Sequence, residues 1–499
     1  MKKIIKTIVF LMLIPIISYS QLPYINRNYI FSMPWYNMGS TILTTDKGFI
    51  TSSMGGVDSI TRRGGVVITE FDSLGNVLYC KTYGKDSMTL FPGFDGSFCK
   101  IGNKGYAIGG SIGFNGYTGL GYLMRLNVNG DSLWTKVYGN PNIWNIFDFC
   151  RPTIDGGFIL SGHVNIDTNT LDCDIWLLKT DSLGNVEWEK TYNIAIFDRA
   201  WSLILTSDNG YLIAGYSENP TDGFSRNAFL LKTDSIGNFI WKRSIGGNLQ
   251  DGYANVCSDG RGNYLVAYHA GVVQEYPNDE VKNKIAVCLI DSLGNIKWEK
   301  KYGSPEYFKY VRQIQAFNDG TFLINGTKLI VRFLMKVNID GDSLWYREYA
   351  YDITNDTIHS RIDCTIAGAC TLEDGGVLAC GSSFYLEPAD LEEQLWVIRT
   401  DEYGCVVPNC QVYDKVDEQQ NAGYINIYPN PANNYINFTA QDEGLITIYS
   451  INGRKILSSD YKNSQETMSI DISSLSSAMY FVEFISKGNI IETIKFVKE

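Results

Sequence analysis

The chain has 499 residues, 44% hydrophobic and 13% aromatic, so it is long enough for two domains with sizeable cores. Its formal net charge is −12 and its isoelectric point is about 4.9, which argues against a nucleic-acid partner because phosphates need basic surfaces. None of its three histidines is closely spaced with another histidine or a cysteine pair, so we expect no metal site and no cofactor.

The first twenty residues have the pattern of a secretory signal peptide. Lys2, Lys3 and Lys6 form a basic start, and the apolar run TIVFLMLIPIISYS follows. Small residues precede the expected cleavage point, which lies between Ser20 and Gln21. The apolar run is too short for a stable membrane span and no other run is long enough, so we expect an exported chain without a transmembrane segment after cleavage.

A five-residue turn, most often Asp-Ser-Leu-Gly-Asn, recurs along residues 72–405. The first Asp or Asn is expected to cap its own backbone, and the glycine to supply the positive φ that the turn needs. The turns recur about every 55 residues, a spacing that indicates an array of similar units. The seven turn glycines are Gly75, Gly130, Gly184, Gly237, Gly294, Gly341 and Gly404.

Each unit is predicted to contain four short strands. In the third unit the runs GGFILSGH, DIWLLKT and VEWEKTY are rich in β-branched and aromatic residues and are bounded by Gly, Asn and Asp. Seven such units without helical periodicity predict an all-β fold, a seven-bladed β-propeller over residues 21–410. A tryptophan recurs in the fourth strand, and we expect it to dock adjacent blades. Its copies are Trp134, Trp188, Trp241, Trp298 and Trp345.

The seventh unit lacks a fourth strand, because Gly404 is followed by CVVPNC. The segment YINRNYIFS (Tyr24–Ser32) precedes the first unit with the spacing of a fourth strand. We therefore predict that the N-terminal segment completes the last blade, which would remove the two exposed edges of an open ring.

The eleven cysteines lie in a chain whose export permits disulfides. Cys405 and Cys410 flank a short loop where the propeller ends, and we predict a bridge between them. Cys99, Cys150 and Cys370 fall near the starts of first strands, and they are interpreted as small core residues.

The variable connections of the propeller are predicted to lie together on one face, since the other connections are tight turns that leave little material for a pocket. Candidate ligand-binding residues on this face are Asp95, Asp148, Asp198, Asp251, Trp144 and Trp201, with Tyr253, Tyr307 and Tyr310 around them. Acids and aromatic rings near a channel mouth can hydrogen-bond and stack with a sugar. The alternative is that each Asp caps the turn into its strand.

The chain changes character after Cys410. Residues 411–421 are polar and lack strand alternation, so they are interpreted as a linker. About seven short strands separated by turns follow over residues 422–499, a pattern that predicts a small β-sandwich.

This last segment carries a series of short motifs. They comprise Tyr428, Pro429, Asn430 and Pro431, then Asn452 and Gly453 after a strand, and Lys495 and Lys498 in the terminal strand. The series resembles the C-terminal sorting domains, of type A, in type IX secretion substrates of Bacteroidota. The resemblance implies passage through the periplasm and outer membrane by the type IX translocon, removal of the domain by the system's own peptidase, and a secreted or cell-surface location. The repeats also resemble a family of secreted Bacteroidota propellers.

Two functions are consistent with these features. The first is a non-catalytic extracellular binding module, with a glycan as the candidate ligand. The second is a secreted carbohydrate-active hydrolase, which needs two carboxyl groups roughly 5–10 Å apart across a pocket. Repeated aspartates at equivalent positions suit a scaffold better than an asymmetric catalytic pair, so binding is favoured and no catalytic residue is assigned.

Overall fold

The chain divides into two compact units, Met1–Cys410 and Gln411–Glu499. The structure is a computed structural model. It describes residues 24–29, 37–58, 63–84, 89–93, 96–113, 118–166, 172–219, 225–246, 250–275, 280–303, 309–328, 331–349, 362–385, 394–407, 425–429, 431–440, 442–450, 454–462, 467–486 and 489–498. No helix in these ranges is long and apolar enough to cross a membrane.

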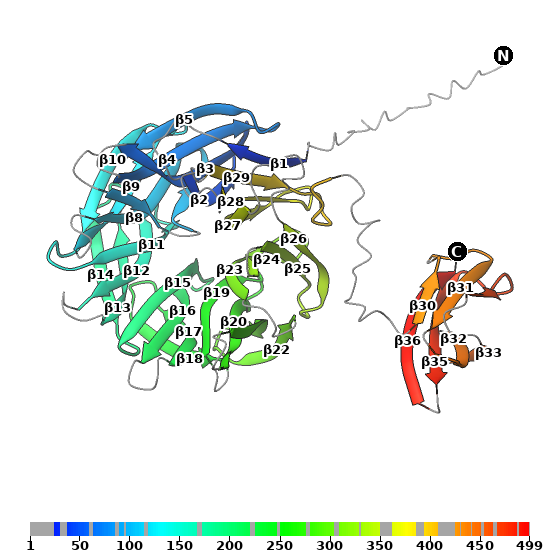
Figure 1. The fold of residues 1–499 in the computed structure, drawn as a ribbon. Helices are drawn as coiled ribbons and strands as arrows, with labels where there is room; N and C mark the ends of the chain where they lie inside the picture. Colours follow the sequence, from blue (N-terminus) through cyan, green and yellow to red (C-terminus); the bar gives the residue numbers. More distant parts are fainter. Residues whose placement is uncertain are drawn as a thin grey trace, which may run out of the picture. The chain divides into compact units, whose positions relative to one another are not determined.

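The first unit is a ring of antiparallel sheets (Figure 1). Its first sheet contains β2 (Asn37–Thr44), β3 (Gly48–Asp58), β4 (Arg63–Asp72) and β5 (Val77–Tyr83). The second contains β6 (Thr89–Pro92), β7 (Phe98–Lys100), β8 (Tyr106–Gly113), β9 (Gly119–Leu126) and β10 (Ser132–Tyr138), with the short 3-10 helix Gly102–Lys104 before β8. β6 and β7 both pair with β8, so the innermost strand of this sheet is interrupted.

An eight-stranded sheet follows and consists of two four-stranded groups. The first group is β11 (Asn145–Pro152), β12 (Phe158–Asn165), β13 (Cys173–Thr180) and β14 (Val186–Tyr192). The second group is β15 (Phe197–Leu205), β16 (Tyr211–Asn219), β17 (Ser225–Thr233) and β18 (Phe239–Ile245). The two groups are joined by one parallel residue pair, Cys173 with Phe197.

Three further four-stranded sheets complete the unit. One contains β19 (Gln250–Ser258), β20 (Tyr264–Glu275), β21 (Glu280–Ile290) and β22 (Ile296–Tyr302). The next contains β23 (Lys309–Ala316), β24 (Phe322–Lys328), β25 (Val331–Val337) and β26 (Ser343–Tyr349). The last contains β27 (Ile362–Thr371), β28 (Val377–Tyr385), β29 (Gln394–Arg399) and, from the other end of the unit, β1 (Ile25–Tyr29).

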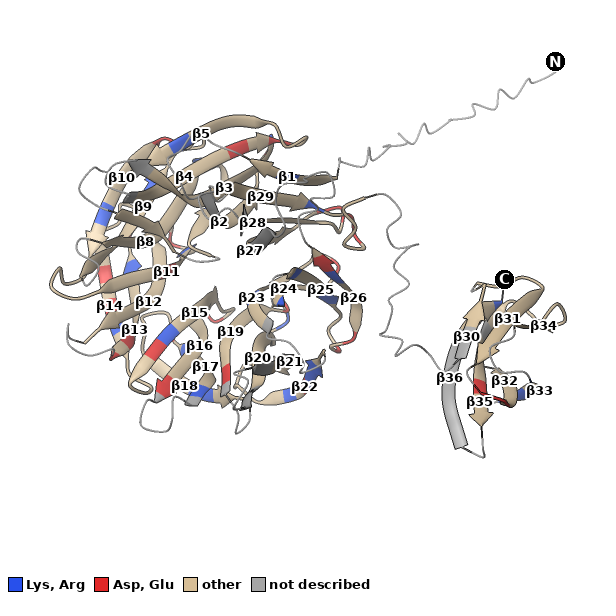
Figure 2. Cartoon of the chain, viewed as in Figure 1, with Lys and Arg blue, Asp and Glu red and all other residues tan. Residues whose placement is uncertain are grey.

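Burial explains the composition of the strands. Middle strands such as β8 and β13 are almost wholly buried because neighbouring sheets cover both of their faces, and they are correspondingly apolar. Outer strands such as β14 and β22 expose most of their residues to solvent, and their sequences carry charges of both signs; Figure 2 shows basic segments of β22 in blue. The core is therefore divided into clusters between neighbouring sheets. One cluster contains Ala107 and Leu123 of the second sheet together with Phe147 and Trp176 of the next, whose rings stack with 4.1 Å between centroids.

The recurrent turns have the predicted mechanism. In the third copy the Asp181 carboxylate accepts hydrogen bonds from the backbone N–H groups of Leu183 and Asn185 at 2.9 and 2.8 Å. Gly184 has φ of 77°, and a Cβ at this position would lie 2.8 Å from the Trp134 ring of the preceding sheet. The fourth-strand tryptophan therefore docks adjacent sheets, as predicted.

A second contact repeats at the same junctions. The last residues of the outer strand carry a side chain that donates a hydrogen bond to the carbonyl oxygen of the turn glycine in the following sheet. The donor–acceptor pairs are Tyr83–Gly130, Tyr138–Gly184, Tyr192–Gly237, Arg243–Gly294, Tyr302–Gly341 and Tyr349–Gly404.

The N-terminal strand occupies the outer position of the last sheet. β1 pairs antiparallel with β29, with Ile25 opposite Arg399 and Tyr29 opposite Leu395. The Tyr29 hydroxyl donates to the Gly75 carbonyl oxygen of the first sheet at 2.7 Å, which is the same junction contact as in the other sheets. The predicted pairing of the N-terminus with the last unit is confirmed over Ile25–Tyr29. The rest of the predicted segment, up to Ser32, lies outside the described residues.

The second unit has two sheets that share a core. One contains β30 (Ile425–Tyr428), β31 (Tyr435–Ala440) and β34 (Met468–Asp471), and the other contains β32 (Gly444–Ser450), β33 (Lys455–Tyr461), β35 (Ala478–Ser486) and β36 (Asn489–Lys498). Phe438 of the first sheet meets Tyr461 and Phe484 of the second, with ring centroids 5.2 and 5.4 Å away.

Candidate functional site

The variable connections of the ring meet on one face, called the loop face. It carries the starts of the innermost strands β11, β15, β19 and β23, together with the ends of β12, β16 and β20. The opposite face, called the turn face, carries hydrogen-bonded tight turns such as Asp181–Asn185 and Thr206–Gly210.

Three of the predicted aspartates lie at the starts of inner strands, and all three are buried. Asp148, Asp198 and Asp251 have relative exposures of 2%, 0% and 1%. Asp148 lies 3.3 Å from the Nδ1 atom of the buried His163, and Asp251 accepts a hydrogen bond from the Gly271 N–H at 2.9 Å. These carboxylates therefore have partners inside the protein, while Asp95 lies outside the described residues.

Asp198 caps a turn in the way that the alternative interpretation proposed. Its carboxylate accepts hydrogen bonds from the backbone N–H groups of Ile194 and Ala195, the latter at 3.0 and 3.1 Å. Burial raises the pKa of Asp198 to about 6, and the two backbone donors lower it in part. The geometry gives this carboxylate the task of holding the connection into β15.

The two candidate tryptophans lie on different parts of the loop face. Trp144 precedes β11, is half-buried, and covers Gly113 and Gly119 of the preceding sheet. Trp201 of β15 is buried and has ring contacts to Tyr216 and Tyr253 at centroid distances of 6.1 and 4.7 Å. Trp201 is therefore mainly a packing residue beneath the loop face, and the half-buried ring of Tyr253 lies next to it.

Tyr253 is the centre of an aromatic group that we call the Tyr253 cluster. Besides the Trp201 contact, its ring lies 4.7 Å from Tyr216, 4.9 Å from His269 and 5.3 Å from Tyr310, measured between centroids. Trp201 lies on β15, Tyr253 on β19 and Tyr310 on β23, so the inner strands bring together three of the aromatic residues expected near this face. Tyr307 lies outside the described residues.

The backbone of Tyr253 is unusual. Its φ is 51°, in the left-handed region that residues with a Cβ rarely adopt. The register between β19 and β20 shifts on both sides of Gly252, so Tyr253 stands at an irregular point of the sheet. Strained backbone of this kind is often found where a side chain is presented for function.

One ion pair borders the Tyr253 cluster. The Arg226 guanidinium of β17 lies over the rings of Tyr216 and Tyr253 at 4.7 and 5.1 Å, and it forms an ion pair with Glu218 of β16. Its Nη1 atom also donates to the Tyr253 hydroxyl at 3.2 Å. Burial, with the nearby Arg226 charge, lowers the pKa of His269 to about 3, so this imidazole is neutral at physiological pH.

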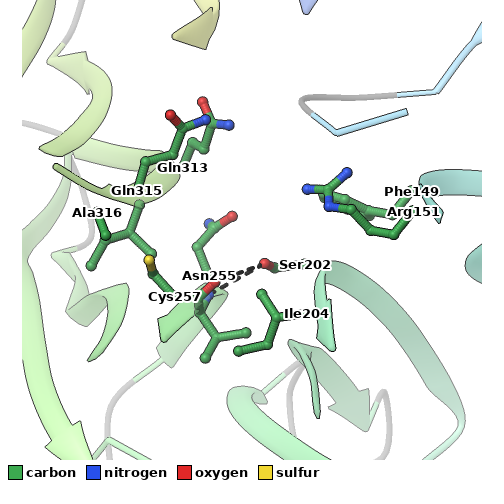
Figure 3. A pocket seen from close by; sticks show the side chains of 11 residues that line it. Phe149, Arg151, Ser202, Ile204, Asn255, Cys257, Gln313, Gln315 and Ala316 are labelled. Carbon is green, nitrogen blue, oxygen red and sulfur yellow. Dashed lines mark hydrogen bonds between the residues drawn. The ribbon is translucent and has the colours of Figure 1, made fainter. Parts of the chain in front are cut away.

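A cavity of about 280 Å³ lies further along the same inner strands, where four of them converge (Figure 3). Its polar lining comprises Arg151 of β11, Ser202 of β15, Asn255 of β19, and Gln313 and Gln315 of β23. Figure 3 shows Arg151 on one side of the space and the two glutamines across from it. Arg151 donates to the carbonyl oxygens of Gly96 and Cys150, which fixes its position.

The turn face is not flat, which corrects the expectation that tight turns leave no room for a pocket. A groove of about 640 Å³ lies between the last two sheets and is lined by Asp319, Lys336, Leu344, Trp345, Asp374 and Tyr403, among others. Along this groove the Trp345 indole donates to the Glu402 carbonyl oxygen at 2.9 Å, and Lys336 forms an ion pair with Asp319.

Sequence reasoning missed the charged and imidazole members of the site. Arg226, Glu218 and His269 lie on second and third strands, whose ends were treated only as connections. They reach Tyr253 because β16, β17 and β20 flank β19 in space. Single residues such as these carry no repeated pattern by which the sequence could have identified them.

The C-terminal unit is assigned by comparison with protein families. Residues 426–499 match the family of secretion system C-terminal sorting domains. This sorting domain of the type IX system indicates secretion through the outer membrane to the cell surface or the exterior. Within it, Tyr428 and Pro429 are exposed at the end of β30, and Lys498 is buried on β36. Asn430, Asn452, Gly453 and the side chain of Lys495 lie outside the described residues.

A comparison with curated proteins found no match. Among solved structures, the WD40 domain of Neurospora crassa Pan2 is 9% identical, with a TM-score of 0.43 over 74% of this chain and 92% of that one. The NanB sialidase from Streptococcus pneumoniae is 11% identical, with a TM-score of 0.40 over 76% and 70%. An α-L-arabinanase from Penicillium chrysogenum is 10% identical, with a TM-score of 0.38 over 63% and 99%. With TM-scores below 0.5, these likenesses assign no function.

Proposed function

We propose that the chain is an exported seven-bladed propeller that acts as a non-catalytic binding module at the cell surface or outside the cell, with a glycan as its ligand. In this proposal residues 1–20 are the signal peptide, 21–410 the propeller, 411–421 a linker and 422–499 a type A sorting sandwich from a Bacteroidota protein. Its partners in export are the type IX translocon and sorting-domain peptidase.

The blade number is supported by the junction contact. An outer-strand side chain bonds the turn glycine of the next sheet at six junctions, and Tyr29 with Gly75 makes the seventh. Seven equivalent junctions that return to the first sheet are what a closed seven-bladed ring requires, if the eight-stranded sheet counts as two blades.

The Tyr253 cluster is the observation that carries the binding proposal. Tyr253 and Tyr310 are half-buried rings on a rigid scaffold, and aromatic faces stack on the apolar face of a sugar. The Arg226–Glu218 pair beside them offers donors and acceptors to hydroxyl groups. The buried Asp148, Asp198 and Asp251 hold this face from inside, and together with Trp144 they are proposed to shape the site.

A glycan array with the secreted protein tests the proposal. Any hit is measured again with Tyr310→Ala and with Tyr253→Gly, since glycine accepts the left-handed backbone. We expect each change to weaken binding about tenfold, the equivalent of about 1.4 kcal/mol. Phe239→Ala is the matched control, because this ring is 59% exposed on the outer strand β18, and it should leave the affinity unchanged.

The second candidate function, a carbohydrate-active hydrolase, is tested with any glycan that the array identifies. Incubating a bound glycan with the protein and analysing its chain length would reveal cleavage. Cleavage by the unaltered protein would contradict the non-catalytic proposal, and cleavage that survives Tyr253→Gly would place the chemistry elsewhere on the ring. An unchanged affinity in both tyrosine variants would move the site away from the Tyr253 cluster.

A further inference from the structure

Two cysteines from neighbouring sheets touch inside the ring. Cys99 of β7 and Cys150 of β11 have relative exposures of 6% and 0%, and their Sγ atoms lie 3.9 Å apart. Both are free thiols in the structure. The sequence analysis interpreted them separately as core residues, and it could not show that they are in contact.

The backbone around the pair is already fixed. The Cys150 N–H donates to the Gly96 carbonyl oxygen at 3.1 Å, and the Arg151 guanidinium also donates to Gly96. These bonds join β11 to the short segment that leads into β7. A disulfide needs the sulfur atoms about 2.05 Å apart, so the two side chains must move closer together than their present 3.9 Å to form one.

A covalent link at Cys99 would hold the short strand β7 in place. The inner strand of the second sheet is interrupted, and β7 has three residues with three register pairs to β8. It also contacts the neighbouring sheet, through Gly96 and Cys99. A bond at Cys99 would anchor this short strand to the longer and regular β11.

We propose that Cys99 and Cys150 form an inter-sheet disulfide in the exported protein. The type IX sorting domain directs the chain through the periplasm, an oxidising compartment in which disulfides form and persist.

The chemistry is thiol–disulfide exchange with a periplasmic disulfide donor. The Cys99 thiolate attacks one donor sulfur, and a mixed disulfide forms as the donor's other sulfur leaves as a thiolate. Cys150 then loses its proton and attacks the Cys99 sulfur, which releases the second donor thiolate. The donor gains two electrons and two protons, and the two cysteines lose them. Because both thiols are buried in the folded ring, the exchange takes place before the second and third sheets have packed.

Peptide mapping tests the bond directly. The exported full-length or naturally processed protein is denatured in iodoacetamide without reduction and cleaved before each aspartate. Cleavage releases residues 95–130 and 148–154, each with one cysteine. We expect these two peptides to be linked and to separate after reduction. Carbamidomethyl groups on both cysteines would overturn the proposal.

A stability measurement gives a second, independent readout. Cys405 also forms a disulfide, so Cys405 and Cys410 are first replaced by Ala. In this background dithiothreitol should lower the thermal midpoint of the parent, and it should have no effect in Cys99→Ala or Cys150→Ala. Cys288→Ala, at another buried free cysteine, should keep the reductant effect. An equal effect of the reductant in all variants would contradict the bond. If a variant does not fold, peptide mapping of the unaltered protein decides whether the bond exists.

Discussion

At the residue scale, the turn glycines satisfy two separate constraints: a positive φ, which the sequence pattern predicted, and the close approach of a side chain from the preceding sheet. All seven have φ between 76° and 83°, a region that a Cβ disfavours. Most also lie against the docking tryptophan of the preceding sheet. Gly156, at a different tight turn, has φ of 84° but nothing within 4 Å of its missing Cβ. The two positions therefore separate backbone strain from crowding.

We predict that Gly237→Ala destabilises the ring more than Gly156→Ala. Both changes place a Cβ on a left-handed backbone, at about 1–2 kcal/mol. At Gly237 the added carbon also meets the Trp188 ring at 2.7 Å, so the junction must open. Chemical denaturation of both variants measures the difference, and equal losses would mean that the tryptophan contact is easily rearranged.

The buried titratable groups of the loop face predict how stability depends on pH. The pKa of His269 is about 3 in the folded protein and 6.5 in its unperturbed state. Since the folded state binds fewer protons, the contribution of His269 is complete above pH 6.5 and is lost as the pH falls toward 3. We expect His269→Gln to reduce the loss of thermal stability across this window.

Asp198 provides a control of opposite sign. Its pKa of about 6 lies above the usual 3.8, so its contribution is complete below pH 3.8 and is lost as the pH rises through 6. In Asp198→Asn the amide oxygen can still accept from the backbone, and the loss between pH 3.8 and 6 should disappear. A profile that neither substitution alters would show that other groups determine the acid behaviour.

At the element scale, the junction bond is the unit that joins sheet to sheet. A tyrosine near the end of an outer strand donates to a turn glycine at six of the seven junctions, and Arg243 takes this place at the other. The spacing of the turns and strands made the repeating element predictable. On β18, Ile245 stands where the other outer strands have tyrosine, and Arg243 two residues earlier supplies the donor, because its Nε atom reaches the Gly294 oxygen of the next sheet at 2.8 Å.

We predict that Tyr29→Phe weakens the closing junction by about 1 kcal/mol, the net value of one hydrogen bond. The matched variant is Tyr138→Phe, which removes the corresponding bond at an internal junction. Tyr29 lies on a separate five-residue strand, so its loss should also accelerate hydrogen exchange in β1 and β29. Equal exchange in the two variants would mean that closure is held by the strand pairing alone.

At the scale of the whole molecule, the fold class, the strand pattern and the place of the N-terminal strand were predictable, because they depend on repeated residues and on chain order. The site was less predictable. Aspartates before the inner strands were identified from their positions, but burial of Asp148, Asp198 and Asp251 follows from packing between sheets. The left-handed backbone of Tyr253 and the approach of Arg226 are singular features without a repeat.

We also expect the C-terminal unit to act in export and the first unit to fold without it. Deleting residues 422–499 should leave a folded propeller in the periplasm of the native host, because residues 426–499 match the sorting family and the first unit has its own cores. Immunoblots of periplasmic and extracellular fractions measure this, with protease resistance as the test of folding. Normal amounts of the deleted form outside the cell would contradict the export role.

The pairing of β1 with β29 has a consequence for the order of folding. Asn26 accepts a hydrogen bond from the Trp396 indole across 370 positions of the chain. Strands that emerge first during synthesis must therefore wait for those made hundreds of residues later, and contacts of such long sequence separation form slowly. Each intermediate sheet can pair with its predecessor as it appears, whereas β29 keeps an open edge until β1 returns to it. Closure should thus be the last and slowest step, and an unclosed ring would be the species most exposed to edge-to-edge aggregation.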